Sequence, residues 1–140
     1  MTTSRSEAAV IRIAAAVIVD ERGRTLLVRK RGTEAFMQPG GKIGPGEPAP
    51  AALLRELREE LGCDAEGEIR PLGRFSAPAA NEAETMVEAE LFAVHLLGEI
   101  APAAEIEEAR WHDPAEPAPF PLAPLTRDHV LPLVRQWERG

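Results

Sequence analysis

The chain has 140 residues, a length that predicts one domain over residues 1–140 with a hydrophobic core of its own. Its formal net charge of −7 argues against a nucleic-acid partner and against an anionic membrane surface, but not against a nucleotide held through a metal ion. The single cysteine excludes an internal disulfide and a thiolate zinc cluster, and it fits a reducing compartment, so we expect a cytoplasmic location.

The N-terminal part predicts short strands. Residues 1–8 contain no apolar signal core and predict a disordered lead. The nearly continuous apolar run Val10–Asp20 predicts a strand buried on both faces. A turn at Glu21–Arg24 then predicts a hairpin with a second strand at Thr25–Arg29, and Phe36–Gln38 predicts a short extended piece.

A glycine-rich segment and a helix follow. Residues 39–46 hold four glycines and two prolines, which predicts a loop. Residues 48–61 predict a helix: proline suits its first turn, the run from Ala51 to Leu61 consists of strong helix formers, and Gly62 is a suitable C-terminal stop. At 100° per residue, one face of this helix carries leucines and the adjacent face carries glutamates. The leucine face consists of Leu53, Leu54, Leu57 and Leu61, and the glutamate face consists of Glu56, Glu59 and Glu60.

The glutamate face has two interpretations. Like charges three or four residues apart cost about 0.2–0.5 kcal/mol per pair. A solvated surface face, partly neutralised by Arg55 and Arg58, is the simpler interpretation. A site for Mg²⁺ is the other, because this ion takes oxygen ligands from one or two carboxylates, from water and from substrate phosphates.

The C-terminal half predicts three more strands and a second helix. Residues 68–77 predict an irregular edge strand, Thr85–Leu97 the longest strand, and Glu105–His112 an alternating one. Residues 113–124 predict a proline-rich connector, and 126–139 a helix that Thr126 caps. Strands that flank two helices indicate an α/β fold with a mixed sheet covered on both sides. His95 is expected in the core, and Cys63 is expected to be inert.

The spacing around the helix resembles the Nudix box. Its seven fixed residues are Gly41, Glu47, Arg55, Glu56, Glu59, Glu60 and Gly62. With typical residue usage, the probability that all seven residues match by chance in one window of a sequence is on the order of 10⁻⁸. Cys63 departs from the pattern, which has an aliphatic residue there. The resemblance implies an α/β/α sandwich and a MutT-like hydrolase that attacks the diphosphate of a nucleoside diphosphate derivative.

Several site residues are implied by this resemblance. Metal ligands for Mg²⁺, with Mn²⁺ as an alternative, would be the Gly40 carbonyl, Glu56, Glu59 and Glu60. Arg55 would hold the carboxylates in place and pair with Glu47. The catalytic base is either Glu56 or a carboxylate of a later loop. Among Glu99, Glu105, Glu107 and Glu108 we choose Glu105, and Glu82 and Glu84 are outside candidates.

The substrate is less well defined. Expected contacts come from Arg29, Arg31, Phe36, Gln38 and Lys42, although edge charge and core packing are alternatives for these side chains. The short chain favours a nucleoside triphosphate pyrophosphohydrolase. Pro78, beyond the box, favours an ADP-ribose or nucleoside diphosphate sugar pyrophosphatase, and a non-catalytic nucleotide-sensing domain is the alternative of a different class. A small-molecule nucleotide is thus the expected partner, and the family also suggests a homodimer.

Overall fold

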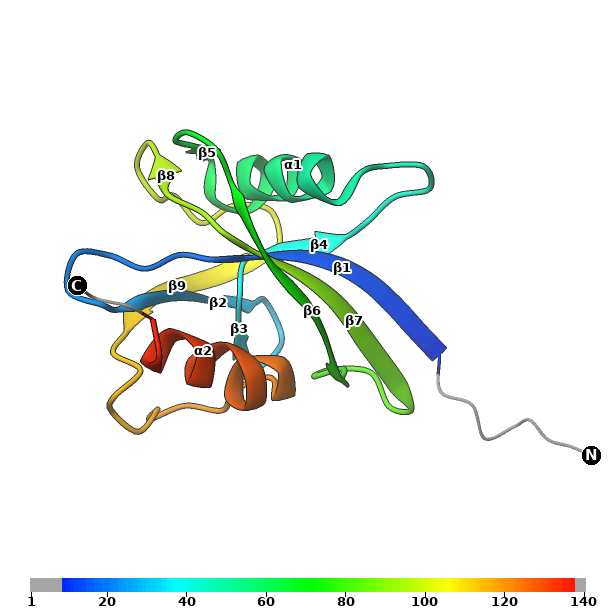
Figure 1. Cartoon of the computed structure of the whole chain (residues 1–140). Coiled ribbons are helices and arrows are strands. Elements are labelled where there is room, and N and C mark those ends of the chain that lie inside the picture. Colours follow the sequence, from blue (N-terminus) through cyan, green and yellow to red (C-terminus); the bar gives the residue numbers. More distant parts are fainter. Residues whose placement is uncertain (1–8, 138–140) are drawn as a thin grey trace, which may run out of the picture.

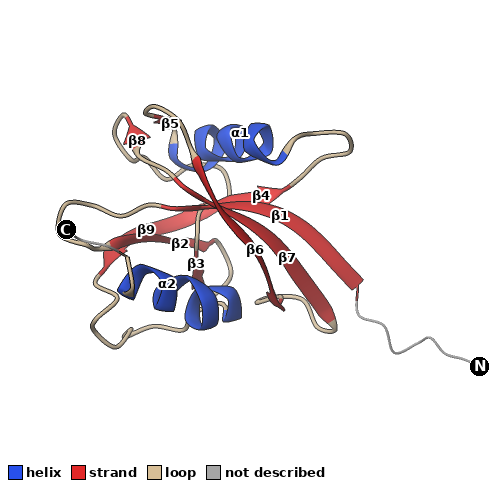
Figure 2. Cartoon of the chain, viewed as in Figure 1, coloured by secondary structure: helices blue, strands red, loops and turns tan. Residues whose placement is uncertain are grey.

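Two helical regions cover opposite sides of a central β-sheet in the computed structural model, which describes residues 9–137 (Figures 1 and 2). Helix α1 spans Ala49–Leu61 on one side. On the other side a π-helical turn, η2 (Thr126–Val130), continues directly into α2 (Leu131–Arg135). The predicted α/β sandwich is therefore confirmed. The lead expected at residues 1–8 and the end of the helix expected at 138–139 lie outside the described residues.

The strands form one mixed sheet and two smaller antiparallel ones. The mixed sheet has the order β4-β1-β7-β6, in which β1 and β7 are parallel and the outer pairs are antiparallel. The second sheet has the order β3-β2-β9, and β5 pairs with β8. The bounds are β1 Ala9–Val17, β2 Thr25–Lys30, β3 Phe36–Met37, β4 Gly40–Lys42, β5 Asp64–Ala65, β6 Arg70–Pro78, β7 Thr85–Ala93, β8 Leu96–Leu97 and β9 Ile106–His112.

The predicted first hairpin is wrong, because β1 and β2 enter different sheets. They meet only at the turn, where an isolated antiparallel bridge joins Val19 to Thr25. The first half of β1 is also not buried on both faces: Val10 is 61% exposed, and burial begins at Ala14. The reason is that the N-terminal halves of β1 and β7 extend together beyond the helices that cover the rest of the sheet (Figure 1).

Each side of the mixed sheet has its own core. On the α1 side, Leu53, Leu57 and Leu61 pack with apolar residues of β1, β2 and β9, whereas Leu54, expected in the core, is only half-buried. On the other side, Val130 and Val134 pack against the opposite faces of β1 and β7. The strands therefore separate α1 and its glutamates from α2.

Two predictions near the C-terminal half are also wrong. The strand predicted as the longest, over Thr85–Leu97, ends at Ala93 and has nine residues, as β1 and β6 do. His95, expected in the core, is exposed because the chain turns there before β8. Thr126 does not cap a helix, because helical geometry already begins at Pro124. Its buried hydroxyl instead donates a hydrogen bond to Oε1 of Gln38, at 2.9 Å. In the described part of the chain, no helix has the length and apolarity to cross a bilayer.

Candidate active site

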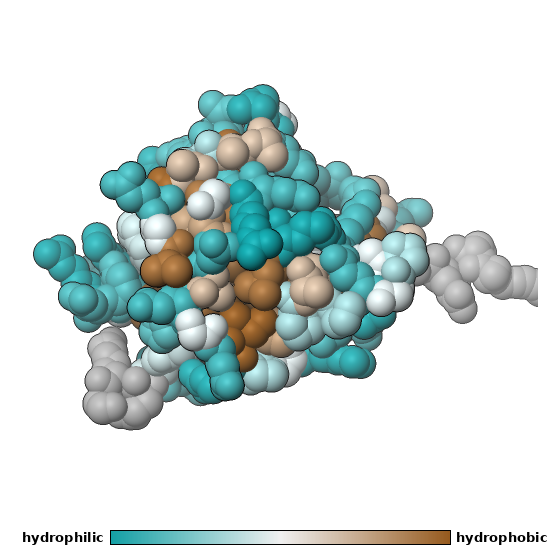
Figure 3. All heavy atoms as spheres, turned by 90° about the horizontal axis from the view of Figure 1, so that it is seen from above, coloured by the Kyte–Doolittle hydropathy of each residue, from teal (hydrophilic) through white to brown (hydrophobic). Residues whose placement is uncertain are grey.

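Helix α1 places its three glutamates at very different depths. The helix begins after Pro48, whose extended backbone suits a start. It ends where Gly62 adopts a left-handed conformation; the Gly62 N–H donates to the Arg58 carbonyl and the Cys63 N–H to the Leu57 carbonyl. Glu60 faces the sheet and is 3% exposed, Glu56 is half-buried, and Glu59 is exposed. Seen from the α1 side, hydrophilic side chains cover most of the surface around a smaller hydrophobic area (Figure 3).

The predicted loop at residues 39–46 begins with a strand, β4, that pairs with β1. Gly40 has φ +147°, and a Cβ there would lie 2.7 Å from the Ala15 Cα and even closer to the Ala14 carbonyl. Glycine is therefore needed at this position for close packing on β1. A Cβ on Gly41 would collide with the Glu56 carboxylate, with both oxygens within 2.7 Å.

Glu60 is a buried carboxylate with an incomplete set of partners. Its Oε1 accepts a hydrogen bond from the Gly40 N–H at 3.1 Å. Burial raises the pKa of Glu60 to about 8, the hydrogen bond from Gly40 opposes this rise, and the charges of Glu56 and Glu105 add to it. A buried, uncompensated carboxylate is costly. A cation held between these carboxylates would relieve that cost.

Arg55 and Glu47 form a two-point ion pair that fastens the β4–α1 connection to the helix. The distance from Nε to Oε2 is 3.0 Å and from Nη2 to Oε1 is 2.9 Å. Glu47 also accepts the Gly44 N–H, and Arg55 and this N–H together lower the Glu47 pKa to about 2. Arg55 reaches Glu56 Oε2 at 3.0 Å through Nη1 as well. The pairing expected for Arg55 is thus present in the structure.

The carboxylates are close to a metal-binding arrangement without forming one. Among residues 9–137, no three His, Cys, Asp or Glu side chains converge as a ready ligand set. Arg55 engages Glu56, and its Nη1 lies 3.7 Å from Glu59 Oε2. The oxygen-only donors of Glu56, Glu59 and Glu60 nevertheless suit a hard divalent cation. Buried Glu60 next to Glu56 is the feature that such an ion fits.

Lys30 and Glu105 complete the charged cluster around Glu60. Lys30 Nζ lies 3.9 Å from Glu105 Oε1, and both charges act on Glu60. Lys30 was not among the predicted site residues. The alternation of β2 could have identified Lys30, because alternate residues of a strand share one face. Lys30 shares its face with Leu26 and Val28, which pack in the core on the α1 side.

The other predicted carboxylates lie in different surroundings. Glu107 pairs with Arg31 at 3.1 Å, and Glu108 pairs with Arg29 and Arg110. None of these charges is among those that act on Glu60. Of the late-loop candidates, Glu105 is therefore the one that the structure brings to the α1 glutamates.

The expected substrate contacts are not gathered in one place. Arg29 and Arg31 are occupied by these ion pairs, and Phe36 is buried against Phe120, with ring centroids 4.3 Å apart. Lys42 is exposed at the end of β4, and its carbonyl accepts a hydrogen bond from Arg55.

Gln38 lies on the α2 side of the sheet and is 5% exposed. It lines a cavity of about 70 Å³ together with Ile13, Pro78 and Leu125. Its Nε2 has no hydrogen-bond partner within the described residues.

Comparison with known proteins identifies the family. The model of the NUDIX domain matches residues 10–134. The chain belongs to the NUDIX family. A Mycobacterium tuberculosis protein, provisionally named 8-oxo-dGTP diphosphatase 2, is 33% identical over 119 residues, which are 81% of this chain and 82% of that protein. An RNA pyrophosphohydrolase of Legionella pneumophila is 39% identical over 57 residues, 41% of this chain, and this match spans only 32% of that relative's length.

Solved structures agree with this family. A MutT NUDIX hydrolase from Burkholderia pseudomallei superposes with a TM-score of 0.72 and 25% identity, covering 92% of this chain and 98% of that one. A UDP-X diphosphatase superposes with a TM-score of 0.73, also at 25% identity, covering 95% of this chain and 66% of that one. The name of the second neighbour specifies UDP-X and that of the first specifies no substrate, so the shared NUDIX fold leaves the substrate open.

Proposed function

We propose that this NUDIX protein is a Mg²⁺-dependent hydrolase that cleaves the diphosphate linkage of a nucleoside triphosphate, releasing a nucleoside monophosphate and pyrophosphate. The observation that supports this most is the buried Glu60, with a pKa raised to about 8, next to Glu56 and beside the Gly40 backbone. Mn²⁺ is the alternative ion, because it accepts the same oxygen donors.

The residues of the site have separate roles in this proposal. Glu56 and Glu60 would hold the ion, together with the Gly40 carbonyl and Glu59. The bound ion would supply positive charge against the diphosphate oxygens and lower the pKa of a water molecule. Arg55, fixed by Glu47, sets the position of Glu56. Lys30 offers a positive charge to a phosphate oxygen on the inner side of the cluster.

Glu105 is our candidate for the general base. It lies in the loop before β9, and that loop is held to α1 because the Ala103 N–H donates to the Glu60 carbonyl at 2.9 Å. Its side chain is 64% exposed, so a water molecule can reach it. Glu56 is the alternative base, but Arg55 already occupies one of its oxygens. A carboxylate within reach of the attacking water removes its proton.

The nucleoside would enter on the side of Gln38. Gln38 lies on the α2 side of the sheet and the α1 glutamates lie on the other side, so a nucleotide whose phosphates are held by those glutamates would pass around the edge strand β4 for its base to reach the Gln38 amide. The cavity there is too small for a whole nucleoside and has apolar walls, which suits the edge of a base. The unpaired Nε2 can donate to a base carbonyl. Arg29, Arg31 and Phe36 have no part in this proposal.

A sugar-linked nucleoside diphosphate is the second candidate substrate. Two observations favour it: the structural similarity to a UDP-X diphosphatase, and the presence of Pro78 in the wall of the Gln38 cavity. Product analysis separates the two, since a triphosphate yields monophosphate and pyrophosphate, whereas ADP-ribose yields AMP and ribose phosphate.

The test is a panel of nucleoside triphosphates and nucleoside diphosphate sugars, assayed with Mg²⁺, with Mn²⁺ and with EDTA. We expect metal-dependent release of the products above, and loss of activity in Glu56→Gln and Glu60→Gln while both remain folded. A matched control is Glu116→Gln, which alters an exposed carboxylate outside the site. A folded wild-type protein that cleaves no member of the panel would support a nucleotide-sensing domain instead.

Two further expectations belong to this proposal. The buried, unpaired Cys63 fits a reducing compartment such as the cytoplasm. A homodimer through the edge strand β6 or the proline-rich segment predicts a sedimentation coefficient that depends on protein concentration.

A further inference from the structure

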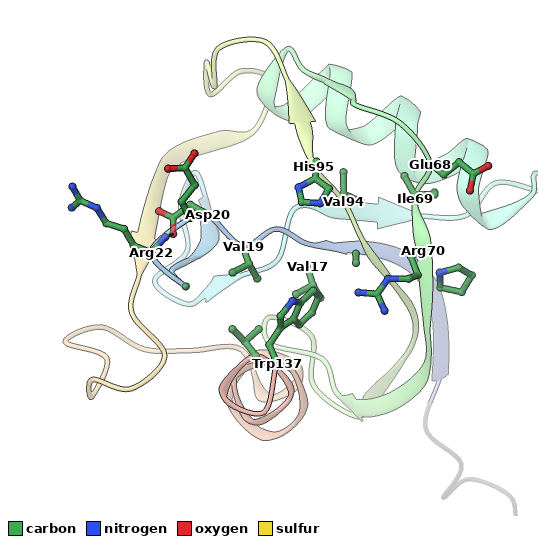
Figure 4. Close-up of a pocket in the computed structure, with 15 residues that line it drawn as sticks. Val17, Val19, Asp20, Arg22, Glu68, Ile69, Arg70, Val94, His95 and Trp137 are labelled. Carbon is green, nitrogen blue, oxygen red and sulfur yellow. Dashed lines mark hydrogen bonds between the residues drawn. The ribbon is translucent and has the colours of Figure 1, made fainter. Parts of the chain in front are cut away.

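A cavity of about 660 Å³ lies away from the glutamates of α1. It opens where the ends of β1 and β7, the start of β6 and the C-terminal end of α2 meet (Figure 4). None of its lining residues belongs to the segment from Gly40 to Gly62. Its volume falls within the range of about 300–1,000 Å³ that is usual for small-molecule sites.

One wall of the cavity is apolar and includes an aromatic ring. Val17 and Val19 come from the end of β1, and Val134 and Trp137 come from the helical region opposite. These side chains belong to, or pack on, the core of the α2 side. The Trp137 indole is half-buried and projects into the space next to Val17 (Figure 4). A flat ring can therefore lie on a surface that is already in place.

The opposite rim provides positive and polar groups. The Arg70 guanidinium lies 5.5 Å from the centroid of the Trp137 ring, and within residues 9–137 it forms no ion pair. The His95 ring, exposed where β7 ends, has no hydrogen-bond partner in the same range, and both side chains are directed toward the cavity (Figure 4).

Three acidic residues also line the cavity: Asp20, Glu21 and Glu68. Glu21 is exposed in the turn that follows β1. The Asp20 carboxylate accepts the backbone N–H groups of Arg22 and Arg24 and pairs with the Arg24 side chain. The Glu68 carboxylate points away from Trp137 (Figure 4). The groups that converge on the open space are therefore an indole, a guanidinium and an imidazole.

We propose that this cavity is a second nucleotide site, which binds a nucleoside 5′-monophosphate. Bases stack on aromatic side chains, and a guanidinium binds phosphate through two parallel hydrogen bonds. Because Arg70 already lies against the indole, a base at Trp137 has a guanidinium within reach of its phosphate. His95 donates a further hydrogen bond to that phosphate. The proposal does not depend on the proposed catalytic function, because the cavity shares no lining residue with the α1 site.

The experiment is an NMR titration of the full chain with AMP in EDTA, which keeps divalent ions away from the α1 glutamates. We expect saturable shifts at Val17, Val19 and Val134. Arg70→Gln weakens AMP binding by about tenfold or more, whereas Arg127→Gln, an exposed arginine of η2 outside the cavity, leaves it unchanged. Adenosine, which lacks the phosphate, binds about tenfold more weakly than AMP.

Three results would overturn the proposal. The first is the absence of saturable shifts at these valines up to about 5 mM AMP, a concentration that detects even weak binding. The second is a set of shifts confined to residues 40–62. The third is equal binding of adenosine and AMP. Arg70 is exposed, so its replacement leaves the core intact, and Arg70→Lys, which keeps a positive charge, retains part of the affinity.

Discussion

Replacing Glu60 by glutamine should stabilise the metal-free protein at neutral and alkaline pH. The pKa of this buried carboxyl rises from 4.5 to about 8 in the folded state. A folded state that holds the proton more tightly than the unfolded state loses stability as the pH rises between those two values. Glutamine keeps a carbonyl that can accept the Gly40 N–H but has no charge to bury.

The size of this effect follows from the same pKa. Each pKa unit is worth about 1.4 kcal/mol, so this shift costs the metal-free fold about 3 kcal/mol at pH 7, where folded Glu60 still holds its proton while the unfolded carboxyl is ionised, and on the order of 5 kcal/mol above pH 8, where the charge is buried. The glutamine NH₂ group needs a partner of its own, which reduces the gain to about 2–3 kcal/mol at pH 8. Below about pH 4.5 both carboxyl and amide are neutral and the charge contribution vanishes, so the variant should then be less stable than wild type by the cost of its NH₂ group, about 1–3 kcal/mol.

The assay is urea unfolding in EDTA at several pH values between about 4.5 and 8.5. The difference between variant and wild type should grow with pH, and titration of other groups cancels in that difference. Glu59→Gln is the matched control, since this carboxylate is 55% exposed and should show no such growth. Parallel stability curves for wild type and Glu60→Gln would refute the reasoning. With Mg²⁺ added, wild type should gain stability and Glu60→Gln should gain much less.

Three other changes test separate parts of the site. The Glu47 pKa is lowered to about 2, so its pair with Arg55 stabilises the fold above about pH 4.5, and this stabilisation is lost as the pH falls toward 2. Glu47→Gln should therefore raise the pH midpoint of acid unfolding, which circular dichroism can follow. Gly40→Ala should destabilise the protein by about 3 kcal/mol or more in urea, since its Cβ collides with the β1 backbone; unchanged stability would contradict this packing. Lys30→Gln should lower kcat/KM about tenfold, whereas Arg31→Gln, which alters an exposed surface pair, should change it little.

The helix and its glutamate face were predictable because their information is local. Leu53, Leu57 and Glu60 follow the helical period, and Gly62 is the kind of residue that ends a helix. The resemblance to the Nudix box also implied the pair of Glu47 with Arg55. The helical period did not predict how deeply each glutamate is buried: Glu60 is 3% exposed and bonds to Gly40, Glu56 is half-buried over Gly41, and the Glu59 side chain is 55% exposed.

The parts that were mispredicted depend on which strands meet. Val19 and Thr25 resemble the ends of an ordinary hairpin, but β1 pairs with β7, from far along the chain, and β2 pairs with β9. The same non-local pairing turns Gly40–Lys42 into a strand and brings Lys30 and Glu105 together across sequence. Sequence patterns predict the exposure of a strand, but they do not specify its partner.

The hydrogen bond between the Gly40 N–H and Glu60 makes the intervening segment a closed ring. Within this ring, the Glu47–Arg55 ion pair joins the β4–α1 connection to the middle of α1. These two links together fix the distance between β4 and the C-terminal part of α1. The loops that we propose to contact the organic part of a substrate, around Gln38 and Pro78, lie outside this ring. Insertions or exchanges in those loops can therefore alter what is recognised while the phosphate-cleaving geometry is inherited unchanged.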